Sequence, residues 1–305
     1  MTAVTSPVET RRERHPHRRP LTSESPVMWN ELGRITLAFQ LGPGFLLACM
    51  HPDFSRVAEQ RGARFRTDPT GRAARAAGSL LTSVYGADEA LAEGERLRAA
   101  HRNLSAVAED GTRVHALQGG VWAWVAHATV YSFITRLDYF GPGLPETERE
   151  QFYQRDAVPL LRLLHVAPRQ IPPTYREWRA QFDAFASDDL AATVTARDYW
   201  QVIGALPAPE ALPALLRALW PIVIAPYRWL LVFASRGMLP PAARTALGLT
   251  WTGRDERRLR FIGQIVGRVA GVLPERLSYL PIAYEARRAD YATRALRTVL
   301  AARPR

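Results

Sequence analysis

Lysine is absent from this 305-residue sequence, and cysteine occurs once, at Cys49. A single cysteine excludes an intrachain disulfide and a cysteine-rich zinc centre. The same scarcity is typical of proteins in a reducing compartment, so the sequence predicts a cytoplasmic location. The twin arginine Arg11-Arg12 does not change this prediction. An export signal needs its apolar segment close to the arginines, whereas 22 residues separate this pair from the apolar stretch 35–50.

Long hydrophobic runs are also missing. The best apolar candidate, 219–234, is interrupted by Pro221, Pro226 and Arg228. A bilayer-spanning helix needs about 20 consecutive apolar residues, so we expect no membrane span. The hydrophobic content of 47% is nevertheless enough for one large core.

Basic residues exceed acidic ones by 11, and all 40 of them are arginine. Such uniform use suggests codon bias rather than selection for phosphate contacts. A one-sided excess occurs near the C-terminus, where Asp290 accompanies six arginines: Arg287, Arg288, Arg294, Arg297, Arg303 and Arg305. This stripe is compatible with contact to RNA or to an anionic membrane, but a solvated helix face is the commoner explanation. We therefore expect no nucleic-acid partner and at most a weak peripheral membrane contact.

Motifs for several common reactions are absent. There is no CxxC, no HExxH, no histidine pair four residues apart and no ExxH of the di-iron type. There is neither a GxSxG turn nor a glycine-rich phosphate loop. Zinc-dependent, hydrolytic and nucleotide-binding functions therefore have no support in the sequence.

The chain is expected to form one all-α domain behind a short tail. Residues 1–26 are rich in Arg, Pro, His, Ser and Thr without apolar periodicity, which predicts a disordered tail. Residues 27–305 carry helix start and stop signals in nearly every segment. A short extended piece is expected at 111–117, and the apolar helix after the proline-rich stretch 206–213 is expected to pack back on the core. Helices are expected at 71–85, 88–104, 121–139, 214–236, 240–247, 254–272 and 284–302, with others beginning at Pro145 and Thr174.

The helix expected from Gly71 carries Arg72, Arg75 and Ser79 on one flank, since an α-helix has about 3.6 residues per turn. Small residues follow on the same helix: Ala73, Ala76, Ala77 and Gly78. They leave room for a neighbouring helix or for a flat cofactor. An arginine there is suited to bind a carboxylate in bidentate fashion or to polarise bound dioxygen. The alternative is a solvated flank with a tight helix contact behind it.

Two histidines are candidates for chemistry. His101 falls in register with Leu97 and Leu104 on the apolar face of its helix, and a neutral imidazole in an apolar wall can ligate haem iron. His127 lies in a helix that is otherwise apolar almost all round, which predicts a central, buried position. For each, the alternative is a core histidine bonded to a backbone carbonyl or another protein group.

Taken in order, these segments resemble the MpaB-type oxygenases, a family related to the latex-clearing proteins that cleave rubber. The similarity runs from about Gly44 to Ala286 and rests on the order and spacing of many short segments. The segments are 46–52 (LLACMHP), 65–69 with Gly71-Arg72, 84–86, 98–101, 111–116, 124–129, 172–174, Leu239-Pro240 with Arg244, 247–249 and 281–283.

The resemblance implies a helical core with a globin-like arrangement, a haem b held by one histidine, and oxidation of a hydrophobic small molecule with dioxygen as co-substrate. His101 matches the family's axial histidine, and Arg72 matches its arginine. The family's Lys-Thr pair falls on Arg75 and Ala76. His127 matches the second histidine, on the helix that would line the pocket.

Three departures from the family pattern bear on the reaction. Ala76 stands in place of the threonine, and Arg75 stands in place of a lysine; an arginine stays protonated and is a poor iron ligand. Ala126 is an extra residue that turns His127 by about 100° on an ideal helix. Gln-Gly at 118–119 replaces the usual Asp-Pro. The distal side of the haem is therefore expected to differ.

Together these observations predict a haem-b-dependent oxidoreductase that acts by oxidative cleavage, hydroxylation or dehydrogenation. His101 is the expected iron ligand, and His127 is kept as the second candidate for that place. Catalytic roles are expected for Arg72, Arg75 and His127. Cofactor contacts are expected from Arg72, His101, Trp124, His127 and Tyr131.

Beside this prediction remain a basic surface-binding protein that uses the C-terminal arginines and two alternatives for the pocket. A Cys49 thiolate would give P450-like chemistry, although its surroundings in the sequence lack the positive charge that lowers a thiol pKa. A non-catalytic protein would hold haem or a lipid in the same pocket without turnover, and the loss of threonine at position 76 favours this alternative.

Overall fold

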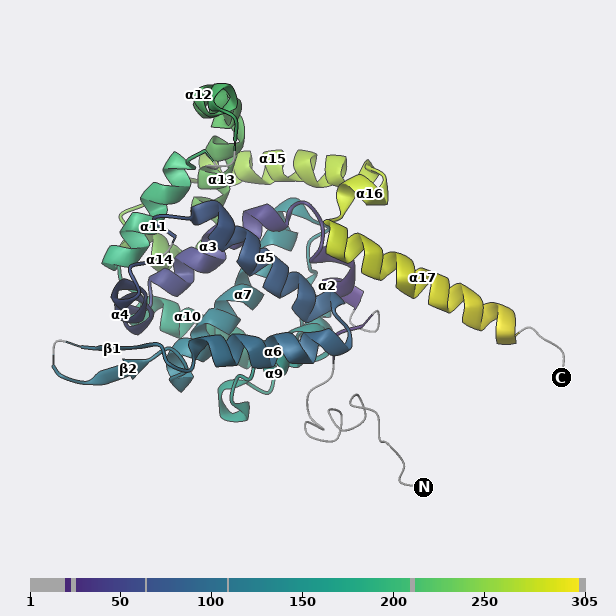
Figure 1. The fold of residues 1–305 in the computed structure, drawn as a ribbon, viewed down its shortest axis with the longest axis horizontal. Coiled ribbons are helices and arrows are strands. Elements are labelled where there is room, and N and C mark those ends of the chain that lie inside the picture. The colour runs from purple at the N-terminus through teal and green to yellow at the C-terminus, as the bar shows by residue number, and fades with distance from the viewer. Residues whose placement is uncertain (1–19, 23–25, 64, 109, 209–211, 302–305) are drawn as a thin grey trace.

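The computed structural model describes residues 20–22, 26–63, 65–108, 110–208 and 212–301. The expected tail, 1–26, lies outside the described residues apart from 20–22 and Pro26. Helices dominate the described part, and its only sheet has two strands, so the prediction of an all-α domain is confirmed (Figure 1). The elements are α2 (Pro26–Glu31), α3 (Leu37–Cys49), α4 (Pro52–Gln60), α5 (Pro69–Tyr85), α6 (Asp88–His101), β1 (Ser105–Val107), β2 (Arg113–His115), α7 (Gly119–Phe140), α8 (Glu146–Phe152), the π-helix η1 (Tyr153–Ala157), α9 (Val158–Leu163), the 3₁₀ helix η2 (Pro168–Gln170), α10 (Tyr175–Asp188), α11 (Val194–Ala205), α12 (Ala214–Val223), α13 (Ala225–Met238), α14 (Pro241–Ala246), α15 (Gly253–Val272), α16 (Glu275–Ser278) and α17 (Pro281–Ala301).

Helix α7 is the centre of the fold, and α3 packs along it (Figure 1). Most residues of α7 are buried, which confirms the prediction of a central helix at 121–139. Helix α15 lies closely against its C-terminal end. Any side chain at Gly263 or Gly267 would collide with the carbonyl oxygens of Tyr139 and Phe140. The two glycines therefore allow this close approach.

Helix α5 and the start of helix α6 lie where local signals predict, whereas α6 ends at His101 rather than near Leu104. The Asp68 side chain accepts a hydrogen bond of 2.9 Å from the Gly71 N–H, and Pro69 occupies the first turn of α5. Gly86 ends this helix. Asp88 and Glu89 then place negative charge at the positive N-terminus of α6.

A short hairpin follows α6. Strand β2 lies inside the extended segment expected at 111–117, which confirms that prediction. Its antiparallel partner β1, with Ser105 opposite His115, was not predicted. Three residues are too few for an alternating apolar pattern to stand out in the sequence.

The apolar segment 214–236 differs from its prediction. It forms two helices, α12 and α13, bent by 50° at Ile224, because Pro226 has no N–H to continue the hydrogen-bond ladder. Helix α13 packs on the core as expected, with Leu231 and Phe233 among its buried residues. Helix α12 contains no buried residue, so the expectation is wrong for this first part of the segment. Among the described residues no single helix meets the length and hydropathy of a membrane span, whereas this bent pair meets them jointly.

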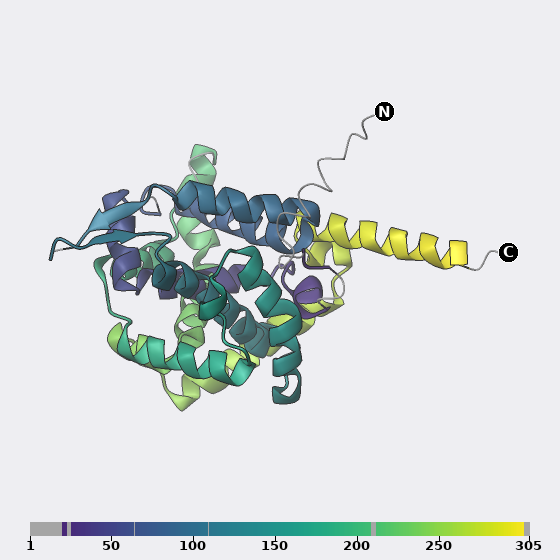
Figure 2. The ribbon, with the colours of Figure 1, turned by 90° about the horizontal axis from the view of Figure 1, so that it is seen from below.

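Helix α17 projects from the body as a single helix (Figures 1 and 2). Ala283 is its only buried residue. Arg287, near its start, donates to the Asn30 side chain at 2.7 Å, and Arg294 pairs with Asp290 at 2.8 Å. The predicted basic stripe is therefore on an exposed helix, as a solvated face would be, and its last two arginines lie outside the described residues.

Arg136 is a fully buried cation near the C-terminal end of α7. Its guanidinium donates to the Gln40 side chain at 3.2 Å, to the Thr36 hydroxyl at 2.8 Å and to the Glu31 carbonyl at 2.9 Å. Burial lowers the pKa of Arg136 to about 10, which still leaves it protonated at neutral pH. The side chain thus joins the end of α2 and the start of α3 to the central helix.

We expect Arg136→Met to lower the free energy of unfolding by about 3 kcal/mol or more, because three buried acceptors lose their donor. Urea denaturation measures the change. The matched control is Arg260→Met on exposed α15, where the arginine pairs with Glu256 at 2.8 Å and the expected loss is below about 1 kcal/mol. Equal losses in the two variants would contradict this role for Arg136.

Candidate functional site

His101 lies in the last turn of α6 with one ring nitrogen engaged. Its Nδ1 is 2.7 Å from the Leu97 carbonyl oxygen, so Nδ1 carries the proton and Nε2 keeps its lone pair. The ring packs edge-on against Trp122 of α7, with 5.2 Å between ring centres. Burial is the main cause that lowers the pKa of His101, which keeps the imidazole neutral at pH 7. Histidines that ligate metals commonly donate their other N–H to a carbonyl in this way.

Arg72, on α5, faces the same region as His101. Its guanidinium lies over the ring of Phe45, 4.5 Å from the ring centre, and its charge contributes to the lowered pKa of His101. Burial lowers the pKa of Arg72 itself. In the described part of the chain no carboxylate is hydrogen-bonded to it. A half-buried cation of this kind is a suitable partner for a carboxylate of a bound group.

Aromatic side chains form one wall of this region. Phe45 of α3 contacts Tyr199 of α11 at 4.8 Å and both Phe54 and Phe65 at 5.9 Å, measured between ring centres. Burial raises the pKa of Tyr199, and the charge of Arg72 acts on the same hydroxyl. The wall is therefore largely apolar, with the guanidinium of Arg72 over Phe45 and that of Arg66 over Phe65.

Cys49 is the other iron ligand considered from the sequence. It lies close enough to Arg72 for the positive charge to lower the pKa of its thiol. Burial nevertheless dominates and raises the pKa of the Cys49 thiol. The sulfur therefore stays protonated at neutral pH, whereas an iron ligand must be a thiolate.

His127 has both ring nitrogens bonded. Its Nε2 is 2.9 Å from the Gln170 carbonyl oxygen, and its Nδ1 accepts a hydrogen bond of 3.0 Å from the Trp178 indole. These bonds place the proton on Nε2, and burial lowers the pKa of His127 to about 4. Neither nitrogen is free to bind a metal in this arrangement.

The remaining predicted residues lie away from His101. Trp124 donates to the Leu47 carbonyl at 2.8 Å and stacks on Phe182 of α10, 5.0 Å between ring centres. Tyr131 stacks on the same Phe182 ring at 4.3 Å. Arg75 is exposed and binds the Asp68 carboxylate at 3.0 Å.

The structure thus brings together Arg72 and His101 and separates them from Trp124, His127 and Tyr131, which face α10. Sequence reasoning missed the aromatic neighbours Phe45, Trp122 and Tyr199. Trp122 could have been predicted. On an ideal helix it lies roughly opposite Trp124, so the two side chains cannot line the same site. Phe45 and Tyr199 come from distant helices and had no local signal.

The residues present fit a haem, on three observations. The Nε2 lone pair of His101 is directed away from its bonded carbonyl. Arg72 supplies a cation suited to a propionate. Phe45 beneath the Arg72 guanidinium and Trp122 against the His101 ring supply aromatic surface that suits an apolar macrocycle. Among the described residues no group of three or more His, Cys, Asp or Glu side chains is arranged to hold a metal ion.

The fold and this site define a helical protein with a histidine-bearing, aromatic-lined site. A family model described as "ER-bound oxygenase mpaB/B'/Rubber oxygenase, catalytic domain" matches residues 29–268. The chain belongs to this family, as the resemblance implied, and so carries an oxygenase catalytic domain. Neither the curated proteins nor the solved structures gave a match.

The lowered pKa of His127 predicts an acid-dependent loss of stability. Its folded-state pKa of about 4 lies below the ordinary 6.5, so the unfolded chain binds the proton first as the pH falls. The contribution is fully present above pH 6.5 and is lost as the pH falls toward 4. We expect this loss to reach about 3 kcal/mol in the free energy of unfolding.

Chemical denaturation of wild type and His127→Gln between pH 7 and pH 4 measures this contribution. A glutamine can keep both hydrogen bonds but does not titrate. The free energy of unfolding of that variant is therefore expected to change less steeply with pH. Exposed His115→Ala is the control and should keep the wild-type slope. An unchanged slope in His127→Gln would refute the assignment.

Proposed function

We propose that the protein is a haem-b-dependent oxygenase in which His101 Nε2 would hold the iron. The observation that carries the proposal is the hydrogen bond from His101 Nδ1 to the Leu97 carbonyl. This bond selects the tautomer with a free Nε2, holds the ring plane and makes the imidazole a better donor. His127 is assigned a structural role instead, since both of its nitrogens are bonded.

The haem would supply iron that activates dioxygen for oxidation of an organic substrate. Arg72 would bind a haem propionate or another anionic group at the edge of the site. The Phe45 ring beneath its guanidinium limits the water that competes for that charge. Trp122 packs edge-on against the His101 ring and limits its rotation. The Trp122 indole is itself positioned by a 2.6 Å hydrogen bond to the Leu164 carbonyl.

The aromatic wall of Phe45, Phe54, Phe65 and Tyr199 supports an apolar small molecule as substrate. A cytoplasmic location remains part of the proposal. Consumption of dioxygen by the haem-loaded protein with terpenoid or aromatic compounds tests turnover. Haem binding without dioxygen consumption for any such compound would favour the non-catalytic binding protein.

Replacing His101 should remove the cofactor. We expect His101→Gly to lack the Soret band that wild type develops on addition of haem, because the remaining contacts supply no iron ligand. Added imidazole should restore the band by filling the space that the side chain leaves. Absorption spectra measure both effects.

The matched histidine variants are His127→Gln and exposed His115→Ala, both of which should retain the wild-type Soret band. Circular dichroism checks that each variant is folded. Loss of the band in folded His127→Gln, with its retention in His101→Gly, would assign the iron to the other histidine.

Arg72 and Arg75 form a second matched pair, because they lie three residues apart on α5 in different environments. We expect Arg72→Leu to weaken haem binding about tenfold or more through loss of a charge-assisted hydrogen bond. Arg75→Leu should change it less than about twofold, since Arg75 pairs with Asp68 at the surface. Haem titration measures both affinities, and equal effects would contradict the assignment of Arg72.

A further inference from the structure

Helix α12 exposes nearly all of its apolar side chains. It has the sequence ALLRALWPIV, with Arg217 as its one charged residue and no buried residue. Leu215 is 71% exposed and Ile222 is 74% exposed. A ten-residue helix is marginally stable in water without tertiary packing. An uncovered apolar helix of this kind points to a partner outside the described chain.

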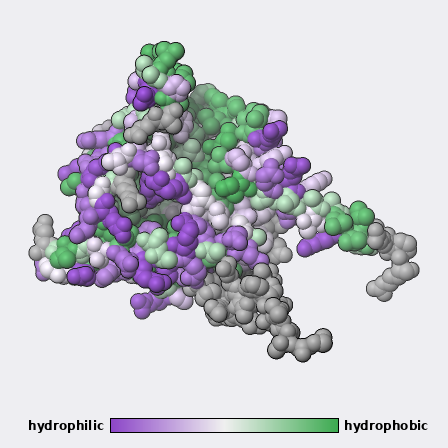
Figure 3. Space-filling model, in the orientation of Figure 1, coloured by the Kyte–Doolittle hydropathy of each residue, from purple (hydrophilic) through white to green (hydrophobic). Residues whose placement is uncertain are grey.

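A second exposed apolar row lies on α15, beside α13. Phe261 is 65% exposed and Val272 is 83% exposed, with Ile265 and Val269 between them at helical spacing. Figure 3 shows hydrophobic residues gathered on α12 and over the neighbouring region of α13 and α15. We call these residues the α12–α15 face: Leu215, Leu216, Leu219, Ile222, Val223, Phe261, Ile265, Val269 and Val272.

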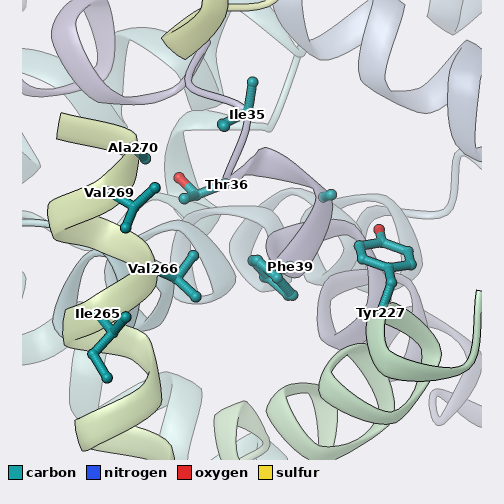
Figure 4. Close-up of a pocket in the computed structure, with 9 residues that line it drawn as sticks. Ile35, Thr36, Phe39, Tyr227, Ile265, Val266, Val269 and Ala270 are labelled. Carbon is teal, nitrogen blue, oxygen red and sulfur yellow. The ribbon is translucent and has the colours of Figure 1, made fainter. Parts of the chain in front are cut away.

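An apolar cavity of about 320 Å³ adjoins this face. Figure 4 shows Val266 and Val269 of α15 on one side, with Phe39 of α3 and Tyr227 of α13 across from them. Thr36 contributes the only hydroxyl besides that of Tyr227. Its size and lining are suited to a hydrocarbon chain rather than to a polar ligand.

Arginines surround the apolar residues. Residues 212–272 contain nine arginines but only two acidic residues, Asp255 and Glu256. Arg254, Arg257 and Arg268 are exposed and fall on the same side of α15 as Phe261, since they lie 7, 4 and 7 residues from it. An apolar stripe interleaved with arginine is typical of helices that lie in the interface of an anionic bilayer, because the long side chains reach the lipid phosphates.

We propose that the α12–α15 face docks the protein on the surface of an anionic lipid bilayer, with α12 lying in the interface. The charge of the face argues against a second copy as its partner, because two such surfaces would bring their positive charges together. Tyr227 and Trp229, both exposed at the start of α13, are the side chains that prefer the boundary between hydrocarbon and water.

The geometry of α13 argues for surface docking rather than a span. Its second half is buried in the protein, including Leu231, Phe233 and Met238. Insertion of the bent α12–α13 pair across a bilayer would remove these residues from the core. Docking of α12 alone leaves the core intact.

Vesicle flotation with the full-length protein tests the proposal. We expect binding to phosphatidylcholine vesicles that contain about 30 mol % phosphatidylglycerol to exceed binding to pure phosphatidylcholine about tenfold or more, and to weaken in about 1 M salt. The double variant Leu215→Glu/Ile222→Glu should lose about tenfold or more of this binding. Neither residue is buried, so its circular dichroism and thermal midpoint should match wild type.

The matched control is Tyr291→Glu/Leu296→Glu on α17, where Tyr291 is 77% and Leu296 59% exposed but both lie away from the face. It should bind vesicles as wild type does. Equal binding to neutral vesicles, no vesicle binding, or an unaffected Leu215→Glu/Ile222→Glu variant would each overturn the proposal. The proposal would also be overturned if the wild type formed a dimer that does not bind vesicles and the Leu215→Glu/Ile222→Glu variant were monomeric. The experiment needs no haem, so its result is independent of the proposed function.

Discussion

Burial of α7 on nearly every side is the constraint on which the structure depends. A polar side chain on such a helix meets no solvent and must bond within the protein. Arg136 does so at one end, through three acceptors from the end of α2 and the start of α3. Trp124 and His127 do so nearer the other end, to the Leu47 carbonyl and to groups around α10. The polar residues of α7 therefore fix the positions of the elements around it.

The same constraint separates two histidines that look alike in sequence. His127, in the buried helix, has both nitrogens satisfied and behaves as a core histidine. His101, in the last turn of half-buried α6, needs only the Leu97 carbonyl of its own helix and keeps Nε2 free. The two arginines of α5 differ for a related reason. Arg75 forms an ion pair with Asp68 at the helix N-cap. Arg72 instead lies over the Phe45 ring and is hydrogen-bonded to no carboxylate among the described residues.

Much of the fold was predictable from local signals. The Asp68 cap, Gly86 and the acidic start of α6 gave α5 and α6 nearly their observed bounds, and apolar character all round gave α7 its central place. Helix α12 shows where such reasoning fails. Its composition matches that of a core helix, but composition does not reveal whether another element covers it. The sequence predicted a candidate site of six residues, of which only Arg72 and His101 lie in one region. Phe45 and Tyr199 reach that region from helices that only the tertiary fold brings near.

The sequence by itself determined the helical class, the bounds of α5, the start of α6 and membership of the oxygenase family. These depend on residue order and on contacts within a turn or two of helix. The tertiary structure decided which histidine keeps a free nitrogen, which arginine is buried and which apolar helix stays uncovered. These outcomes depend on partners far away in the chain. Gln170 and Trp178, for example, lie 43 and 51 residues from His127. No local pattern encodes such a bond.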